Sequence, residues 1–299
     1  MSNYSVLYNS VLEICEEENI NLVPVSDKWI LRLEKNGQVE YIAGFKFPNN
    51  NYASADICND KVATFELLNS FDIECVRHIP IFAKDYTNFN DEYFNDILKL
   101  GNGIVFVKEN RGTCGKNIYV CKNLFEVKSA LSKLFEFSYM AAISPKVSIN
   151  VEYRIIVLNG EVQVIYGKKI KEVFGNGVLT VEELCIEKSI DTENLEEDIK
   201  NIVLEKDEKI KLSNFHNLTK FGDFFEVYDS SVKKELSDLA ITVADVIKIN
   251  FCSVDIVEYN GEFKVLEVNS GVMAETYGKE LNYQKVKAVY KKAICSLFS

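Results

Sequence analysis

The chain has 299 residues, a length that suits one large domain or two to three compact lobes. Hydrophobic residues make up 47% and charged residues 26%, so the composition is that of a soluble globular protein without long disordered segments. The formal charge of -11 argues against the basic face that nucleic-acid binding normally requires, although it permits a small local anion site.

The sequence contains no obvious targeting signal. Its N-terminus lacks the basic and apolar regions of a signal peptide, and no run approaches the roughly 20 apolar residues of a membrane span. Eight cysteines without a CxxC pair, together with only two histidines, argue against a zinc site and favour a reducing compartment. We therefore expect a cytoplasmic protein whose partners include neither a membrane nor nucleic acid.

Apolar spacing and turn signals predict interspersed helices and hairpins along the chain. In chain order, these are a helix at 6–18, a hairpin turn at 36–37, a helix at 61–70, strands at 104–108 and 118–121, a helix at 124–135, a hairpin turn at 159–160, a helix at 230–249, a hairpin turn at 260–261 and a helix at about 283–297. Because the strict alternation of a doubly wound sheet is missing, we expect an α+β chain of small antiparallel sheets. The charged stretch 182–211 is interpreted as a solvated insertion or surface helix without an active-site role.

The hairpin about Asn260-Gly261 carries two acids and an amide whose relative placement depends on the turn. If these two residues form a two-residue turn, Asp255 and Glu267 point to opposite faces. If the loop has an odd number of residues, with Gly261 in a left-handed bulge, Asp255 lies opposite Glu267 and shares a face with Asn269.

On one face, these three side chains would offer hard oxygen ligands to one or two Mg²⁺ ions that also bind phosphate oxygens. The alternative is an ordinary amphipathic hairpin whose acids face water. Apolar residues are expected on both faces, with Phe251, Val257, Phe263 and Val265 beside the acids and Val254, Ile256, Leu266 and Val268 opposite. We favour the metal site, because acids buried in such a hairpin need cations.

Residues 108–117, with the sequence KENRGTCGKN, form a glycine-bearing loop between two predicted strands. The loop has neither the spacing nor the following helix of a P-loop. It is either a simple hairpin turn or a loop whose backbone N–H groups, together with Lys108, contact the phosphates of a nucleotide. Cys114 lies within it, but no histidine is near in sequence to activate a thiol, so we assign it no catalytic role.

Other charged residues add weaker signals for an anion site. Lys61 lies in the first turn of a predicted helix, where the helix dipole disfavours a cation, so either a nearby anion or the neighbouring Asp60 accounts for it. Glu152 and Arg154 alternate onto one face of a predicted strand, and Lys168 lies at the far end of the returning strand.

The order of these features along residues 59–275 resembles the ATP-grasp superfamily. The resemblance is greatest to the branch that contains cyanophycin synthetase, glutathione synthetase-like ligases and ribosomal-protein glutamate ligases, with D-alanine:D-alanine ligase as a more distant relative. The stretches that carry it further are DKVATFELLNSFDIECVRH, FGNGVLTVEEL and NFHNLTKFGD. It implies two α+β lobes that clasp ATP: a short N-terminal lobe at 1–58 precedes a small lobe with the glycine loop at 59–143 and a large lobe with the Mg²⁺ site at 144–299.

The resemblance also implies a role for each matching position. ATP contacts fall on the phosphate-binding lysines Lys61 and Lys108, on Arg111, Gly112, Gly115 and Lys116 of the closing loop, on the adenine-binding linker at Lys146 and Val147, and on Glu152 at the ribose. The metal ligands are Asp255, Glu267 and Asn269, for Mg²⁺ or Mn²⁺. Lys168 matches an arginine directed at the transferred phosphate, and Arg154 is a second candidate for that catalytic role.

The chain departs from its relatives at several of these positions. Glu109 follows Lys108 where relatives have proline, and Lys168 in place of arginine keeps the charge but loses the bidentate geometry. GNG at 175–177 replaces GDG, and SGVMAE after Asn269 replaces a proline-glycine pair in a region where substrates are often read. The identity of the substrates therefore does not carry over.

The implied activity is that of an ADP-forming ligase that joins a small-molecule carboxylate to an amine through an acyl phosphate. The substrates would be amino acids or short peptides. Two rivals are a kinase on the same scaffold, which would stop at phosphoryl transfer to a hydroxyl, and a non-catalytic nucleotide-binding protein. The oligomeric state is open, although the last helix could form the interface of a homodimer.

Overall fold

The computed structural model of the chain describes residues 5–88, 90–113, 115–147, 149, 151–193, 195–212, 222–259 and 261–299. The chain divides into two compact units, one made of residues 1–166 and 226–299 and the other of Gly167–Phe225. Several antiparallel sheets with interspersed helices make the architecture α+β, as the sequence predicts. The division into three lobes at residues 58 and 143 stays a prediction.

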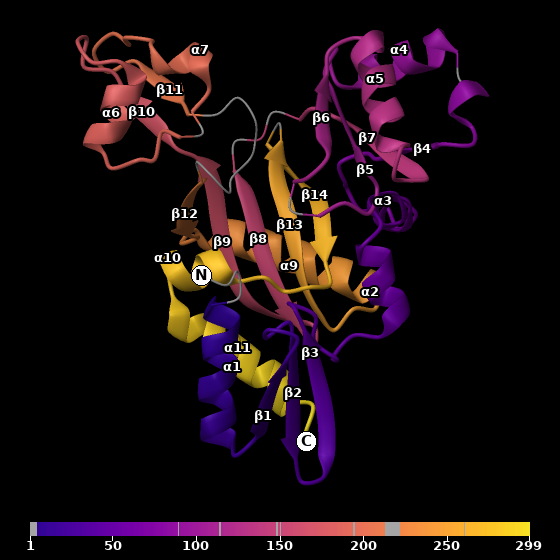
Figure 1. Cartoon of the computed structure of the whole chain (residues 1–299), viewed down its shortest axis with the longest axis vertical. Coiled ribbons are helices and arrows are strands. Elements are labelled where there is room, and N and C mark those ends of the chain that lie inside the picture. The colour runs from indigo at the N-terminus through magenta and orange to yellow at the C-terminus, as the bar shows by residue number, and fades with distance from the viewer. Residues whose placement is uncertain are drawn as a thin grey trace. The chain divides into compact units, whose positions relative to one another are not determined.

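The larger unit begins with a helix and a three-stranded antiparallel sheet. Helix α1 (Ser5–Glu18) packs against α10 (Glu275–Glu280) and α11 (Tyr283–Cys295), so both ends of the chain meet in this unit (Figure 1). Strands β1 (Asn21–Val25), β2 (Ile30–Lys35) and β3 (Gln38–Ala43) follow. Asn36 and Gly37 turn the chain between β2 and β3 with φ of 52° and 81°. These left-handed conformations are those of a tight hairpin turn, which confirms the first predicted hairpin.

A four-stranded sheet in the same unit packs on a large apolar core with one face and carries Lys108 on the other. Its strands are β4 (Ile79–Phe82), β7 (Met140–Pro145), β5 (Val105–Glu109) and β6 (Ile118–Cys121), in that spatial order and all antiparallel to their neighbours. One face packs on α4 (Asp91–Leu100) and α5 (Leu124–Leu134). On the other face, Met140 and Ala142 pack against Val62 of α3 (Lys61–Asn69). Because side chains alternate along a strand, Lys108 belongs to this second face.

A five-stranded sheet carries the predicted acids. Its order is β12 (Gly222–Glu226), β9 (Glu161–Ile170), β8 (Glu152–Leu158), β13 (Phe251–Tyr259) and β14 (Glu262–Asn269), and α9 (Ser230–Ile247) packs on β8 and β13 (Figure 1). Helix α2 (Tyr52–Cys58) lies against β14. Asn159 and Gly160, with φ of 50° and 75°, form the predicted turn between β8 and β9.

The smaller unit contains the charged stretch 182–211. Its described elements include the two-stranded pairing of β10 (Glu172–Phe174) with β11 (Lys209–Lys211), together with α6 (Val181–Glu187) and α7 (Glu197–Lys200). These elements enclose a core of their own: Val173, Val181, Leu184, Cys185, Leu195, Ile199, Leu204 and Leu212. The stretch is therefore part of a small folded unit, because apolar residues recur among its charges.

All five helices that the sequence predicts are present, and their ends differ from the predicted ones by at most two residues. Helices α2, α4 and α10 were not predicted. Asn260 lies outside the described residues, as does most of the NFHNLTKFGD stretch. Among the helices that the structure describes, none is both long and apolar enough to cross a membrane.

Candidate functional site

The pairing of β13 with β14 brings the two predicted acids together by a route that the sequence did not reveal. Near the turn, Tyr259 pairs with Glu262, as a two-residue turn requires, but the register shifts between Asp255 and Ile256. The shift leaves Leu266 as the extra residue of a bulge, and beyond it Asp255 pairs with Glu267. The bulge therefore lies inside the strand, and not at Gly261 as one of the two alternatives proposed.

The same shift corrects the predicted surroundings of the acids. Val257 pairs with Lys264 on the acidic face, whereas Val265 pairs with Ile256 on the opposite face. Phe263 also lies on that opposite face, because it is two residues from Val265 along the strand. The expectation that Phe263 and Val265 lie beside the acids was wrong, since it assumed one register along the whole hairpin.

Asp255 is held by an arginine on the neighbouring strand. Arg154 of β8 pairs with Asp255 across the strands, and its Nε and Nη2 atoms donate to Oδ1 and Oδ2, each at 2.7 Å. The side chains of Arg154 and Asp255 are 15% and 3% exposed. Burial by itself would lower the pKa of Arg154, but the carboxylate of Asp255 raises that pKa well above its ordinary value. Asn269, whose backbone pairs with Ser253, donates its Nδ2 to Asp255 Oδ2 at 3.2 Å.

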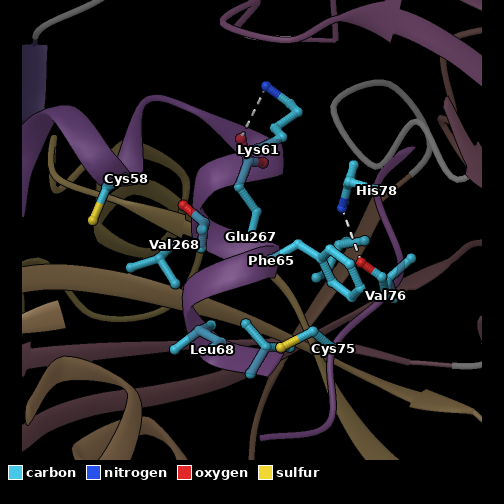
Figure 2. A pocket seen from close by; sticks show the side chains of 12 residues that line it. Cys58, Lys61, Phe65, Leu68, Cys75, Val76, His78, Glu267 and Val268 are labelled. Carbon is cyan, nitrogen blue, oxygen red and sulfur yellow. Dashed lines mark hydrogen bonds and ion pairs between the residues drawn. The ribbon is translucent and has the colours of Figure 1, made fainter. Parts of the chain in front are cut away.

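Lys61 connects the acidic face to the glycine loop. It is the first residue of α3, which Asp60 caps by accepting a hydrogen bond from the Ala63 N–H. The Lys61 ammonium lies 3.6 Å from Glu267 Oε1 (Figure 2). It also donates to the carbonyl of Gly112 at 2.5 Å. These contacts offset the unfavourable position of the cation in the helix dipole, which answers the question that its place in the sequence raised.

Lys108 presents a second cation to the same region. In the four-stranded sheet it pairs with Ala142 of β7 and with Ile118 of β6. Burial, and then the neighbouring charge of Lys61, lower the pKa of Lys108 to about 8, while the charge of Glu267 acts in the opposite direction. Two lysines and a carboxylate are therefore close enough to influence one another electrostatically.

The loop after Lys108 joins two antiparallel strands, so the hairpin itself is confirmed. Arg111 forms an ion pair with Asp56 of α2, and Gly112 N–H donates to the carbonyl of Glu109 at 3.2 Å. Gly115 has φ of 67°, a left-handed conformation that favours glycine, and Lys116 N–H donates to Thr113. Cys114 lies outside the described residues.

The remaining predicted residues lie in the segment 146–168. The N–H of Lys146 donates to the carbonyl of Ile104 at 3.0 Å, so any contact between its backbone and a base would use its carbonyl. Val147 follows it in the connection to β8. Glu152 opens β8 and is 8% exposed, and Lys168 in β9 is 6% exposed. Burial of these two charged side chains is unusual for their types.

The donor set of the acidic face suits a divalent cation that prefers oxygen. Asp255 and Glu267 lie in one row across the hairpin, and the next row on the same face brings Asn269. Since the amide of Asn269 donates through its nitrogen to Asp255, its oxygen is directed elsewhere. Two carboxylates and one amide oxygen are ligands typical of Mg²⁺, so the residues present fit this ion.

Two residues of this region escaped the sequence reasoning. Asn110 is 1% exposed; its side-chain oxygen accepts from the Val62 N–H at 3.1 Å, and its carbonyl accepts from Lys61 at 3.4 Å. His78 is 3% exposed and lies just before β4. In the sequence, each is only a polar residue next to an apolar run, a pattern too common to indicate a functional residue.

The arrangement of the sheets, the glycine loop and the acidic hairpin identifies the fold, as comparisons with known proteins show. RimK-like ATP-grasp domains match residues 168–291 of the chain. The structure of a bifunctional glutathione synthetase from Pasteurella multocida aligns with a TM-score of 0.58 over 95% of this chain and 44% of that chain, at 16% identity. A D-alanine–D-alanine ligase from Bacillus anthracis aligns with a TM-score of 0.56 over 82% and 67%, at 17% identity. The chain has the ATP-grasp fold.

The chain is also similar in sequence to bifunctional proteins of glutathione biosynthesis. The glutathione biosynthesis bifunctional protein of Clostridium perfringens is 25% identical in an alignment of 279 positions that covers 85% of this chain and 34% of that protein. The corresponding protein of Listeria monocytogenes serotype 4b is 26% identical in an alignment of 258 positions that covers 76% of this chain and 32% of that protein. The chain thus spans about a third of the length of these relatives.

Proposed function

We propose that the protein is an ADP-forming ligase that uses Mg-ATP to join the carboxylate of an amino acid or short peptide to an amine. The observation that carries this proposal is the row of Asp255 and Glu267 with Asn269 beside it, facing Lys61 from α3. The likeness to ATP-grasp proteins and to glutathione biosynthesis proteins supports it. A carboxylate is a poor electrophile, and its phosphorylation by ATP would provide the leaving group that an amine displaces.

Some residues of the site would stabilise negative charge on ATP, and others would position the phosphates. Bound Mg²⁺ would supply positive charge to the phosphate oxygens, held by Asp255, Glu267 and Asn269. Lys61 and Lys108 would bind the phosphates as they do in the family. For Lys61 this means exchanging the carbonyl of Gly112 for a phosphate oxygen, a stronger charge-assisted contact.

Arg154 and Lys168 are the candidates for binding the transferred phosphoryl group. Arg154 is already fixed by Asp255 on the acidic face, so its unshared N–H groups would be oriented before the substrate arrives. Lys168 would contribute a buried charge from β9. Glu152 at the ribose, the linker at Lys146 and Val147, and a loop of Arg111 to Lys116 that closes over the phosphates complete the proposed ATP site.

The test is an ADP-release assay over pairs of amino acids, short peptides and amines, with mass spectrometry of the product. A ligase releases ADP only when a carboxylate and an amine are both present, and its product mass equals the sum of the two substrates minus water. ADP release with a hydroxyl compound alone, and a product heavier by one phosphoryl group, would establish a kinase instead. The Glu267→Gln variant should lower turnover by about 100-fold or more, because a charged metal ligand is lost, and unchanged turnover would refute the metal assignment.

A further inference from the structure

His78 has one ring nitrogen bonded and the other without a partner. The residue is 3% exposed, and its Nδ1 lies 2.9 Å from the carbonyl oxygen of Val76. Because a carbonyl only accepts hydrogen bonds, Nδ1 carries the hydrogen and Nε2 bears a lone pair. Among the residues that the structure describes, no hydrogen-bond partner reaches Nε2. A buried acceptor left in this state costs free energy, so its presence calls for a donor.

The surroundings of His78 keep it neutral. Burial, then the charge of Lys108, and more weakly that of Lys61, lower the pKa of His78 well below its ordinary value, while the bond to Val76 acts in the opposite direction. Glu267, the carboxylate that also affects Lys108, lines the same pocket as His78 and Lys61 (Figure 2). A neutral ring with its hydrogen on Nδ1 can only accept a bond at Nε2.

The strand register places Lys108 close to His78. Pro80 of β4 and Lys108 of β5 flank Ala142 of β7 from its two sides, so their side chains share a face. His78 lies two residues before Pro80, and the charge of Lys108 is close enough to lower its pKa. The unpaired acceptor of His78 and the cation of Lys108 are therefore neighbours.

The pocket below this face is too small to hold a substrate. Its lining includes Lys61, Phe65, His78 and Glu267 (Figure 2). The centre of a water molecule can occupy only about 10 Å³ of it, which is room for about one water. The unpaired Nε2 is thus better explained by one water molecule, shared with a neighbouring side chain, than by a ligand.

We propose that His78 is a positioning residue for Lys108: one water molecule donates to its Nε2 and accepts from the Lys108 ammonium, and so orients that ammonium toward the phosphates of ATP. The role in ATP binding rests on the proposed function, whereas the water-mediated contact between the two side chains does not. A lysine held in this way loses less side-chain freedom when the nucleotide binds.

The contact can be tested in the nucleotide-free protein by ¹⁵N NMR with labelled histidine. The sequence has only two histidines, and a His216→Gln variant assigns the signals. We expect a neutral ring with an unprotonated Nε2 for His78 at neutral pH, and we expect the Nε2 resonance to move toward that of an unbonded nitrogen in Lys108→Met. A doubly protonated ring, or an Nε2 resonance that Lys108→Met leaves unchanged, would overturn the proposal.

The role in nucleotide binding is tested by the affinity for Mg²⁺ with a non-hydrolysable ATP analogue. His78→Phe removes the acceptor and should weaken binding roughly tenfold, the effect of losing one hydrogen bond to a charged group. His78→Gln can place an amide oxygen near the position of Nε2 and should bind within about twofold of the wild type. A folded His78→Phe protein with wild-type affinity would refute the role.

These experiments separate this inference from the proposed function. If the wild-type protein does not bind the ATP analogue, the proposed function fails, while the NMR comparison still decides whether His78 and Lys108 are in contact. If His78→Phe does not fold, His78→Gln together with the wild-type spectra decides the question. If the protein binds the ATP analogue but the Nε2 resonance responds neither to Lys108→Met nor to the analogue, the positioning role of His78 is wrong. The proposed function is then unaffected.

Discussion

Replacing Arg154 with methionine should destabilise the protein more than the loss of an exposed arginine would. The substitution keeps much of the side-chain volume but removes both bonds to Asp255, whose carboxylate is 3% exposed. Asp255 would keep the bond from Asn269 but lose its bidentate guanidinium partner. A carboxylate that is almost fully buried is strongly disfavoured when it loses such a partner, because its charge has little access to water.

The size of the effect follows from this burial. Breaking a buried ion pair by removing one partner costs about 3 to 5 kcal/mol, and the 15% exposure of Arg154 favours the lower end of that range. With an unfolding entropy of about 2.1 cal/mol/K per residue, a loss of about 3 kcal/mol lowers the melting temperature of a chain of this length by about 5 °C. Mg²⁺ at about 100 times its Kd for the variant should restore roughly 4 °C, because the ion compensates for the lost charge of Arg154. The same concentration should stabilise the wild type less, since Arg154 already neutralises Asp255 there.

Thermal melting in the presence and absence of Mg²⁺ measures both effects. The matched control is Lys234→Met, which removes an ion pair with Asp238 on the exposed face of α9 and should change the melting temperature by at most about 1 °C. The reasoning is refuted if Arg154→Met melts within about 1 °C of the wild type. It is also refuted if Mg²⁺ raises the melting temperature of the variant no more than that of the wild type.

Three further outcomes are expected. Burial and the charge of Lys61 lower the pKa of Lys108 to about 8, so its charge is present below that pH and lost above it. The Kd for an ATP analogue, measured by calorimetry, should therefore rise between about pH 7 and 9 in the wild type. It should stay level in Lys108→Arg, whose side chain remains charged. Trypsin cleavage after Arg111 should slow when Mg-ATP is added, since the loop would close over the phosphates, and an unchanged rate counts against a closing loop. Gly175→Ala would place a Cβ atom 2.2 Å from the Glu205 carbonyl oxygen and should expose the smaller unit to limited proteolysis, whereas Gly271→Ala, whose nearest neighbour lies at 3.6 Å, should not.

Part of the site could be predicted because its residues lie next to strong local signals. An Asn-Gly pair between alternating strands marks a hairpin, and a hairpin fixes which strands are neighbours. The acids Asp255 and Glu267 flank such a turn, and they do pair. Lys61 and Lys108 could be recognised through their order along the chain, although nothing local distinguished either from an ordinary surface lysine.

Other features could not be read from the chain because they depend on contacts between distant segments. The bond from Arg154 to Asp255 joins residues 101 positions apart, and it exists only because β8 and β13 are neighbours in the sheet. His78 and Asn110 acquire their surroundings when α3 covers the face of the four-stranded sheet that carries Lys108. The compact core of the smaller unit was hidden by the charges between its apolar residues.

The sequence by itself determined the α+β class, five of the helices, the hairpins and the choice of candidate ligands, since periodicity and turn chemistry act over a few residues. Only the tertiary structure decided which face the acids share. A bulge at Leu266 changes the pairing by one residue, and because side chains alternate along a strand, that single residue brings Glu267 opposite Asp255. The position of such a bulge is set by packing on both faces of the sheet, which no short stretch of sequence contains.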